Sequence, residues 1–290
     1  MKKTKIGDLT FDLVNTLYML VLLMLMLYPF VYVLMYSFSD PSLVYGKLLF
    51  YPLGFSLDSY LQCFVTPNVI HGALISIARS LIGPLATIIV IFSGAYALSK
   101  KKLVARKFFS RFVIFTMYFN AGIIPMYILM VTLGLKGTFF VYILPYLPSI
   151  FLMILIRTYL ENLPVELEES AYLDGANDFT IAFKVYLPLC LPIVAAVALF
   201  ECVNQWNYFQ DTLFYNAEIS KNHTLQYVMV TFIQNSPQSL ESAEGGGGNN
   251  FTSTSLRMAM TVITIVPIAL VYPFLQKYFV KGLMIGSIKG

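Results

Sequence analysis

The chain has 290 residues, of which 58% are hydrophobic and 12% charged, with a formal net charge of +4 and a mean hydropathy of +0.73. Soluble domains carry about a quarter charged residues, so this composition excludes an ordinary soluble protein and indicates an integral membrane protein. The basic residues lie beside apolar runs and form no stripe, which argues against nucleic acid as a partner. The cysteines and histidines stand at no metal-ligand or redox spacing, so we expect no metal site.

Six apolar segments are long enough to cross a bilayer as helices, which takes about 20 residues each. The predicted helices cover residues 13–36, 75–98, 112–133, 138–159, 188–210 and 257–277. No run alternates with period two as the strands of a membrane barrel do, so the expected fold class is all-α integral membrane. We interpret residues 1–290 as a single transmembrane domain.

Lysine and arginine residues distinguish the two sides of this predicted domain. They precede the first helix, cluster over 100–111 between the second and third, bracket the loop 161–188 and follow the sixth helix. The positive-inside rule therefore places both termini and the 161–188 loop in the cytoplasm.

The loops on the other side are expected to be external. Residues 39–69 contain several prolines and predict a packed surface loop, and the external loop 211–256 is polar and carries four consecutive glycines over 245–248. No Lys-Ser or Lys-Thr follows the glycines, and no phosphate-binding loop motif occurs anywhere in the chain. Any ATP that drives this protein would therefore be hydrolysed by another subunit.

The fifth predicted helix carries polar and aromatic residues near its outer half: Glu201, Asn204, Trp206, Asn207 and Tyr208. A carboxylate in hydrocarbon costs several kcal/mol, so Glu201 should face protein or a wet cavity. Two interpretations stand for the group: side chains lining a substrate pathway, or an aromatic anchor beside polar residues that join helices. Arg79, in the second predicted helix, either pairs with an acidic group or extends outward to water, and the sequence names no partner for it.

The loop 161–188 is the most acidic part of the chain. Its carboxylates are Glu161, Glu166, Glu168, Glu169, Asp174 and Asp178. Pro164 followed by carboxylates predicts the start of a helix, and Gly175 predicts a tight turn before a second helix from about residue 179. A short helix, a glycine turn and another short helix at a membrane surface would fit a groove on a soluble partner.

This stretch resembles the EAA loop of binding-protein-dependent ABC import permeases. The family pattern is E-A-A, three residues, G, nine residues, I, one residue and L-P. At these spacings the chain has Glu169-Ser170-Ala171, Gly175, Val185 and Leu187-Pro188, with Ser170 and Val185 as mild departures. In that family the loop is a coupling helix that docks on the ATP-hydrolysing subunit. The resemblance thus assigns coupling to Glu169, Ser170, Ala171, Asp174, Gly175 and Ala176.

Further blocks resemble the maltose-type carbohydrate permeases of this family. They are residues 27–30 (LYPF), 119–125 (FNAGIIP), 205–207 (QWN) and the tail 276–290. The resemblance implies the six-helix fold of a type I ABC importer permease, with a core over about 70–280. It also implies that residues 216–255, within the external loop 211–256, correspond to the loop that reaches the docked binding protein, from which the glycine run departs.

The implied function is that of a permease subunit for a carbohydrate or oligosaccharide in a bacterial cytoplasmic membrane, surrounded by membrane lipid. It would have no catalytic residues. The implied partners are a second permease in a heterodimer, an ATPase dimer that binds ATP and Mg, and an extracytoplasmic solute-binding protein. Peptides or amino acids are an alternative cargo. An ion-coupled secondary carrier is a weaker alternative, because Glu201 is the clear intramembrane carboxylate and no internal repeat is evident.

Overall fold

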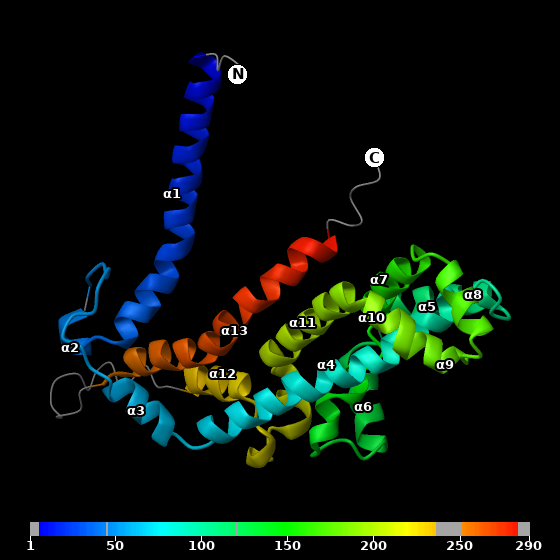
Figure 1. The fold of residues 1–290 in the computed structure, drawn as a ribbon. Coiled ribbons are helices and arrows are strands. Elements are labelled where there is room, and N and C mark those ends of the chain that lie inside the picture. The colour runs from blue at the N-terminus through cyan, green and yellow to red at the C-terminus, as the bar shows by residue number, and fades with distance from the viewer. Residues whose placement is uncertain (1–5, 45, 120, 236–250, 284–290) are drawn as a thin grey trace. The chain divides into compact units, whose positions relative to one another are not determined.

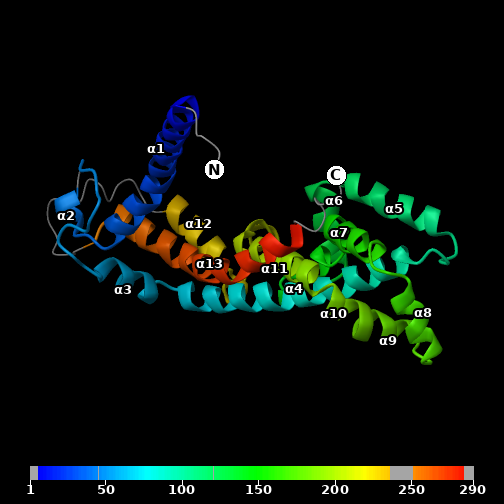
Figure 2. The same ribbon diagram turned by 45° about the horizontal axis from the view of Figure 1, so that its top comes forward.

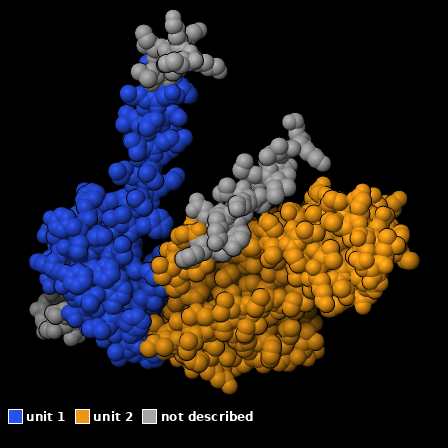
Figure 3. Space-filling view, in the orientation of Figure 1, with its two compact units in different colours: residues 1–67, 229–266 blue, residues 68–228, 267–290 orange. Residues whose placement is uncertain are grey.

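The computed structural model describes residues 6–44, 46–119, 121–235 and 251–283. Every regular element in these ranges is helical, apart from an isolated bridge between Ser39 and Phe55 (Figure 1). The chain forms two compact units, residues 1–67 with 229–266 and residues 68–228 with 267–290 (Figure 3). α12 (Leu225–Asn235) and α13 (Ser253–Leu283) each contribute to both units.

The first unit contains α1 (Ile6–Ser37), α2 (Pro41–Val44), α3 (Asp58–Val65) and the beginning of α13. A hydrogen bond of 2.9 Å from Ser59 Oγ to Ser255 Oγ joins α3 to α13. The apolar part of α1, residues 10–37, has a mean hydropathy of 2.3, and its most apolar window buries nothing within the chain. Such a surface requires lipid or another protein around it.

By length and composition, three helices in the described part of the chain can cross a membrane, namely residues 10–37, 69–99 and 253–273. Three pairs of bent helices can supply up to three more spans. The first pair is α5 (Arg106–Tyr118) and α6 (Ile123–Thr132). The second consists of the short helices η1 (Phe139–Tyr142) and η2 (Leu144–Tyr146), followed by α7 (Ile150–Glu161). The third consists of α9 (Asp178–Thr180), η3 (Ile181–Tyr186) and α10 (Leu187–Leu189), followed by α11 (Leu191–Asn207). The all-helical fold with up to six spans confirms the expected fold class.

The structure interrupts the predicted spans over 112–133 and 138–159, where the sequence places Gly122, Pro125, Pro145 and Pro148, and it also breaks the span over 188–210. The second bent pair turns by 48° and the third by 84°. Proline explains both breaks, since its ring carries no N–H and clashes with the preceding turn. Pro145 and Pro148 lie at the first break, and Pro188 and Pro192 flank the second.

Several predicted helix boundaries also differ from the structure, and two of them have a clear local explanation. The third was expected from residue 112, with Arg106, Lys107 and Arg111 in the preceding loop, whereas α5 begins at Arg106 and includes them. Arg106 fixes this first turn by donating from Nε to the Leu98 carbonyl at 2.8 Å. The fifth was expected to reach residue 210 but ends at Asn207, where Tyr208 turns to an extended backbone.

In the second unit, α4 (Val69–Ser99) packs along α11 and α7 (Figures 1 and 2). The core between these helices is apolar, and its most deeply buried members are Ile91, Phe92, Ile156, Ile181 and Val197. Glycines on α4 allow a close approach, as small residues do in membrane helix pairs. A Cβ added at Gly83 would lie 3.1 Å from the Gln205 side chain.

Two other glycines of α4 lie against neighbours that differ in rigidity, and replacing these glycines tests the packing of the helix. A Cβ at Gly72 would lie 3.1 Å from the backbone nitrogen of Leu225, whereas one at Gly94 would lie 2.8 Å from Sδ of Met153. Overpacking against backbone costs on the order of 1–3 kcal/mol, but the flexible thioether of Met153 can move aside.

We therefore expect Gly72→Ala to lower the unfolding temperature of the purified protein by several degrees, since about 1 kcal/mol shifts it by a few degrees. Gly94→Ala is the matched control. It should leave the unfolding temperature nearly unchanged, because a gain of about 1 kcal/mol in helix propensity offsets the displaced methionine. Thermal unfolding in the same detergent measures both, and a larger loss for Gly94→Ala would contradict the assigned contacts.

Candidate functional site

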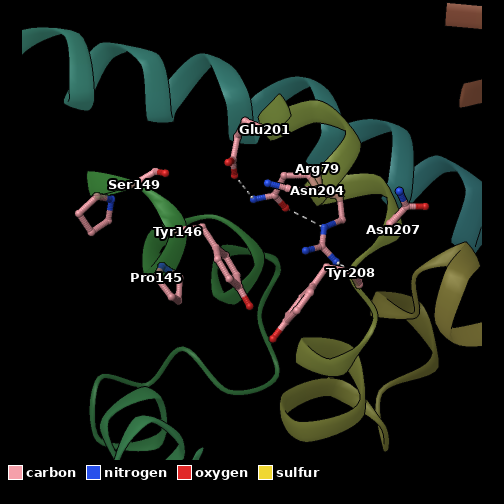
Figure 4. Close-up of a pocket in the computed structure, with 10 residues that line it drawn as sticks. Arg79, Pro145, Tyr146, Ser149, Glu201, Asn204, Asn207 and Tyr208 are labelled. Carbon is pink, nitrogen blue, oxygen red and sulfur yellow. Dashed lines mark hydrogen bonds between the residues drawn. The ribbon is translucent and has the colours of Figure 1, made fainter. Parts of the chain in front are cut away.

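A polar cavity of about 530 Å³ opens in the second unit between α4, α11 and the segment that leads into α7 (Figure 4). Its walls are formed by Arg79, Pro145, Tyr146, Pro148, Ser149, Glu201, Asn204, Gln205, Asn207 and Tyr208. The prolines that break the fourth span supply one wall, because they turn the chain away from α11 before α7 begins. The cavity thus exists where continuous packed helices would have filled the space.

The charge on one wall of the cavity is balanced by an ion pair. Arg79 Nη2 lies 2.5 Å from Oδ2 of Asp211, and both side chains are almost completely buried, at 1% and 0% exposure. Arg79 Nη1 donates to Asp211 Oδ1 at 3.2 Å and to the Tyr208 carbonyl at 2.9 Å. A buried ion pair persists only where its remaining donors and acceptors are satisfied. This contact therefore fixes the turn after α11 against the middle of α4.

Gln205 connects the ion pair to Glu201. Its Oε1 accepts from Arg79 Nε at 3.0 Å, and its Nε2 donates to Glu201 Oε1 at 3.1 Å (Figure 4). Because Arg79 can only donate, the amide of Gln205 can present only its oxygen there and its nitrogen to Glu201. The network thereby holds the Glu201 carboxylate as a hydrogen-bond acceptor at the edge of the cavity.

Aromatic rings complete the site. The guanidinium of Arg79 lies 4.6 Å from the centre of the Tyr142 ring, and the Tyr142 hydroxyl donates to the Asn222 carbonyl at 2.6 Å. Tyr146 and Tyr208 meet edge to face, with ring centres 5.5 Å apart. The cavity therefore combines hydrogen-bonding carboxylate and amide groups with flat apolar ring surfaces.

The structure brings together Glu201, Asn204, Asn207 and Tyr208 of the residues that the sequence assigned to a substrate pathway. It places Trp206 elsewhere. Trp206 is buried and lines a separate apolar cavity of about 170 Å³ between α4, α11 and α13, beside residues such as Leu81 and Pro267. That position gives Trp206 no access to the polar cavity.

Sequence reasoning left three members of the network without a site role: Arg79, Gln205 and Asp211. Arg79 was noted as a charge without a named partner, and Gln205 only as part of the block 205–207. Arg79, the lone cation of an apolar segment, was the available signal, since intramembrane charges pair, but Asp211 begins the predicted polar loop 211–256 and was not matched to it. Their separation of 132 positions along the chain hid the pairing.

The acidic loop folds as expected, into α8 (Glu166–Leu173), a turn and α9. The turn satisfies the last carbonyls of α8: Ala176 N–H donates to the Ala171 carbonyl and Gly175 N–H to the Tyr172 carbonyl, both at 3.0 Å. This pair of bonds is the Schellman motif, which needs a left-handed residue, and Gly175 supplies it with φ of +78°. The side chain of Asn177 then caps α9 by accepting from Thr180 N–H at 2.8 Å.

The outer surface of this helix–turn–helix is exposed. Glu169, Ser170, Asp174 and Gly175 are exposed, while Ala171 and Ala176 pack partly against the core. Large apolar side chains also face outward, including Leu173 at 89% and Phe179 at 72% exposure. An acidic rim around exposed apolar side chains is typical of a surface that docks on another protein.

A hydrogen bond from the Tyr172 hydroxyl to the Asp178 carboxylate joins α8 to α9 at the exposed surface of the loop. This bond and partial burial raise the pKa of Tyr172 to about 12. The hydroxyl therefore stays protonated, and keeps donating, at every pH near neutrality.

Other sequence assignments fall outside the described residues: Asn120, the glycine run over 245–248 and the last part of the tail, 284–290. Within the described ranges, no group of three His, Cys, Asp or Glu side chains could hold a metal ion.

Comparison with known proteins places this architecture in a family. Residues 91–285 match the family model described as "Binding-protein-dependent transport system inner membrane component". The chain is 34% identical to the "Polygalacturonan/rhamnogalacturonan transport system permease protein YtcP" of Bacillus subtilis (strain 168), over 97% of this chain and 98% of that protein. It is 35% identical to "Protein LplC" of the same organism, over 100% of this chain and 98% of the relative.

A solved structure agrees. The fold matches a chain of a bacterial ABC transporter involved in the import of the acidic polysaccharide alginate, with a TM-score of 0.85 and 30% sequence identity, over 96% of this chain and 100% of the other. The match covers nearly all of both chains. The chain therefore belongs to the family of inner-membrane permease components of binding-protein-dependent ABC transport systems.

Proposed function

We infer that this chain is the membrane-spanning permease subunit of an ATP-driven importer and that its cargo is a carbohydrate. Membership of the family makes the chain a transport component whose ATPase is a separate subunit. The observation that carries the proposal is the exposed helix–turn–helix of α8 and α9, whose continuation through η3 and α10 leads directly into the cavity-lining helix α11.

The exposed loop is the proposed coupling element. Glu169, Ser170, Asp174 and Gly175 would meet the ATPase, while Ala171 and Ala176 fix the loop to the core. ATP and Mg would be bound by the ATPase subunits. Docking there would place the loop, and with it both chain termini, on the cytoplasmic side, as the distribution of basic residues also predicts.

The polar cavity is the proposed substrate pathway. Sugar hydroxyls need donors and acceptors together with flat apolar surfaces, and Glu201, Asn204, Asn207 and Tyr208 provide both. Trp206 is not part of this proposal because it lines the separate apolar cavity. The carbohydrate assignment draws on relatives named as permeases for polygalacturonan/rhamnogalacturonan and for arabinooligosaccharides, and on the alginate importer. Peptides or amino acids remain the competing cargo.

The proposed assembly is a heterodimer of two permeases, an ATPase dimer on the cytoplasmic side and a solute-binding protein outside. The second permease would border the open side of the cavity. ATP binding would draw the ATPases together and move the coupling loops. The cavity would then open toward the binding protein and later toward the cytoplasm, in alternating access.

The first experiment is to tag the chain in its native host, solubilise it gently and identify the proteins that copurify. We expect an ATPase, a second six-span permease and a solute-binding protein, which can then be screened with oligosaccharides. Recovery of the chain alone, together with transport in liposomes on an ion gradient without ATP, would overturn the proposal in favour of a secondary carrier.

Replacing Gly175 tests the coupling role. A Cβ at Gly175 meets no atom within 4 Å, and a non-glycine residue in the left-handed region costs only about 1–2 kcal/mol. We expect Gly175→Asp to fold and to keep ATP hydrolysis in the assembled complex. Its transport per ATP hydrolysed should fall about tenfold or more, a coupling loss in the usual range.

Gly134 offers a matched control, because it has φ of +67° and equally open space but lies at the end of α6. Gly134→Asp should therefore transport as the unchanged complex does. Transport and ATP hydrolysis are measured in the same proteoliposomes. Equal coupling in Gly175→Asp and Gly134→Asp would show that the loop does not couple.

Replacing each of two carboxylates in the cavity region distinguishes a role in transport from a role in stability. We expect Glu201→Gln to assemble normally but to slow uptake of the binding protein's sugar about tenfold, because a charged acceptor is replaced by a neutral amide of the same shape. Asp211→Asn should instead abolish assembly, since removing one partner of a buried ion pair costs about 3–5 kcal/mol. Yield of the complex and sugar uptake measure the two effects, and poor assembly of Glu201→Gln would identify Glu201 as structural.

A further inference from the structure

A cluster of four side chains joins the end of α4 to the coupling loop. Lys100, the first residue after α4, places Nζ 2.6 Å from Oε1 of Glu168 on α8. The same ammonium lies 4.0 Å from the centre of the Tyr96 ring and 5.1 Å from that of Tyr186. The hydroxyl of Tyr186 donates to Oε2 of the same carboxylate at 3.2 Å. We call Tyr96, Lys100, Glu168 and Tyr186 the lysine clamp.

The clamp is more than an exposed surface pair. Exposed lysine–glutamate pairs contribute little, because water screens them and two long side chains must be ordered. Here the two charged side chains are only 18% and 20% exposed. Two ring faces hold the ammonium in place, and their edge-to-face contact, 5.7 Å between centres, fixes the rings relative to each other.

The clamp has a particular position in the chain connections. α8 is joined by the backbone to α7 and, through α9, η3 and α10, to α11, both of which line or flank the cavity. α4 has no such backbone link to α8, since the intervening chain passes through α5, α6 and α7. Lys100 therefore attaches α8 to α4 through side chains.

α4 is a continuous helix from the clamp to the cavity. Arg79 lies on α4, and the rise of an α-helix puts Arg79 roughly 30 Å from Lys100 along the axis. At that other end, Arg79 holds Asp211 and Gln205 and so shapes the cavity wall. A displacement of α8 that pulls Lys100 would thus reach the ion pair along one uninterrupted helix, which contains Pro84.

We propose that the lysine clamp transmits movement of the coupling loop to α4. The cavity then opens by a joint movement of α4 and α11, and not by movement of α11 alone. The inference rests on the proposed function, in which α8 moves with the ATPase. Lys100 and Glu168 are positioning residues, since neither touches the cavity. A clamp that only stabilised the fold would affect the unfolding temperature but not the opening obtained per ATP.

The test uses the complex of this chain with its copurified permease, ATPase and binding protein in lipid nanodiscs. A bimane fluorophore is attached to Ser149→Cys, on the cavity wall, with Cys202→Ser removing the partly exposed native thiol. Bimane emission responds to the polarity around it, so ATP-dependent opening can be followed without a sugar. ATP hydrolysis is measured in the same samples.

Lys100→Met keeps the apolar stem and removes the charge. We expect its bimane response per ATP hydrolysed to fall about tenfold, and Lys100→Arg to restore it because arginine keeps the charge and stacks on aromatic rings. Glu168→Gln should reproduce the loss, and the double variant should be no worse than either single one, as for two residues acting as one unit. Lys102→Met is the control on an exposed lysine two positions away and should respond fully.

Each outcome decides between the alternatives. A full response in Lys100→Met or in Glu168→Gln, with or without a lower unfolding temperature, overturns the clamp and leaves the importer intact. If Lys100→Met fails to assemble, the milder variants Glu168→Gln and Lys100→Arg are compared by the same ratio, the bimane response per ATP hydrolysed. Absence of any ATP response in the complex with native Lys100 and Glu168 would refute the importer function itself, together with the clamp that rests on it.

Discussion

The buried pair of Arg79 and Asp211 is the interaction on which the second unit depends. Two charges removed from water are tolerated only with close geometry and further hydrogen bonds, and here Gln205 and the Tyr208 carbonyl supply them. The pair holds the chain where α11 ends and orients Gln205, which in turn orients Glu201. A stability requirement of the membrane interior thereby determines how the polar groups of the cavity are presented.

The broken helices follow from the same requirement. Backbone groups freed at a break must find partners inside the protein, so a break within a span is tolerated only where protein or a wet cavity surrounds it. Pro145 and Pro148 interrupt the fourth span next to the cavity, and the short 3₁₀ turns there bond the carbonyls of Phe140 and Ile143 to the N–H groups of Ile143 and Tyr146. The interruption creates space beside α11, and Tyr146 and Ser149 line that space. Proline thus opens the site that the ion pair orders.

Sequence patterns predicted the loop better than the cavity. The coupling loop depends on local rules, namely carboxylates at a helix start and glycine in a Schellman turn, and it folded as those rules require. The cavity depends on contacts between distant segments, so Asp211 could not be matched to Arg79 in advance. Trp206 differs from its neighbours, because the helical period of about 100° per residue separates its direction from those of Glu201 and Gln205, in keeping with its place at the separate apolar cavity.

The charge of the cavity wall limits which groups of the cargo this chain could bind. Relatives of this chain are named for polygalacturonan and alginate, which are acidic polymers. The guanidinium on the cavity wall is already matched by Asp211, and Glu201 adds a carboxylate, so this wall offers hydroxyl-binding groups and no net positive charge. A carboxylated sugar would therefore have to be neutralised by the opposite wall, which a second permease contributes in the proposed assembly. In the proposed assembly, this division of roles would be a physical reason to combine two different permease chains.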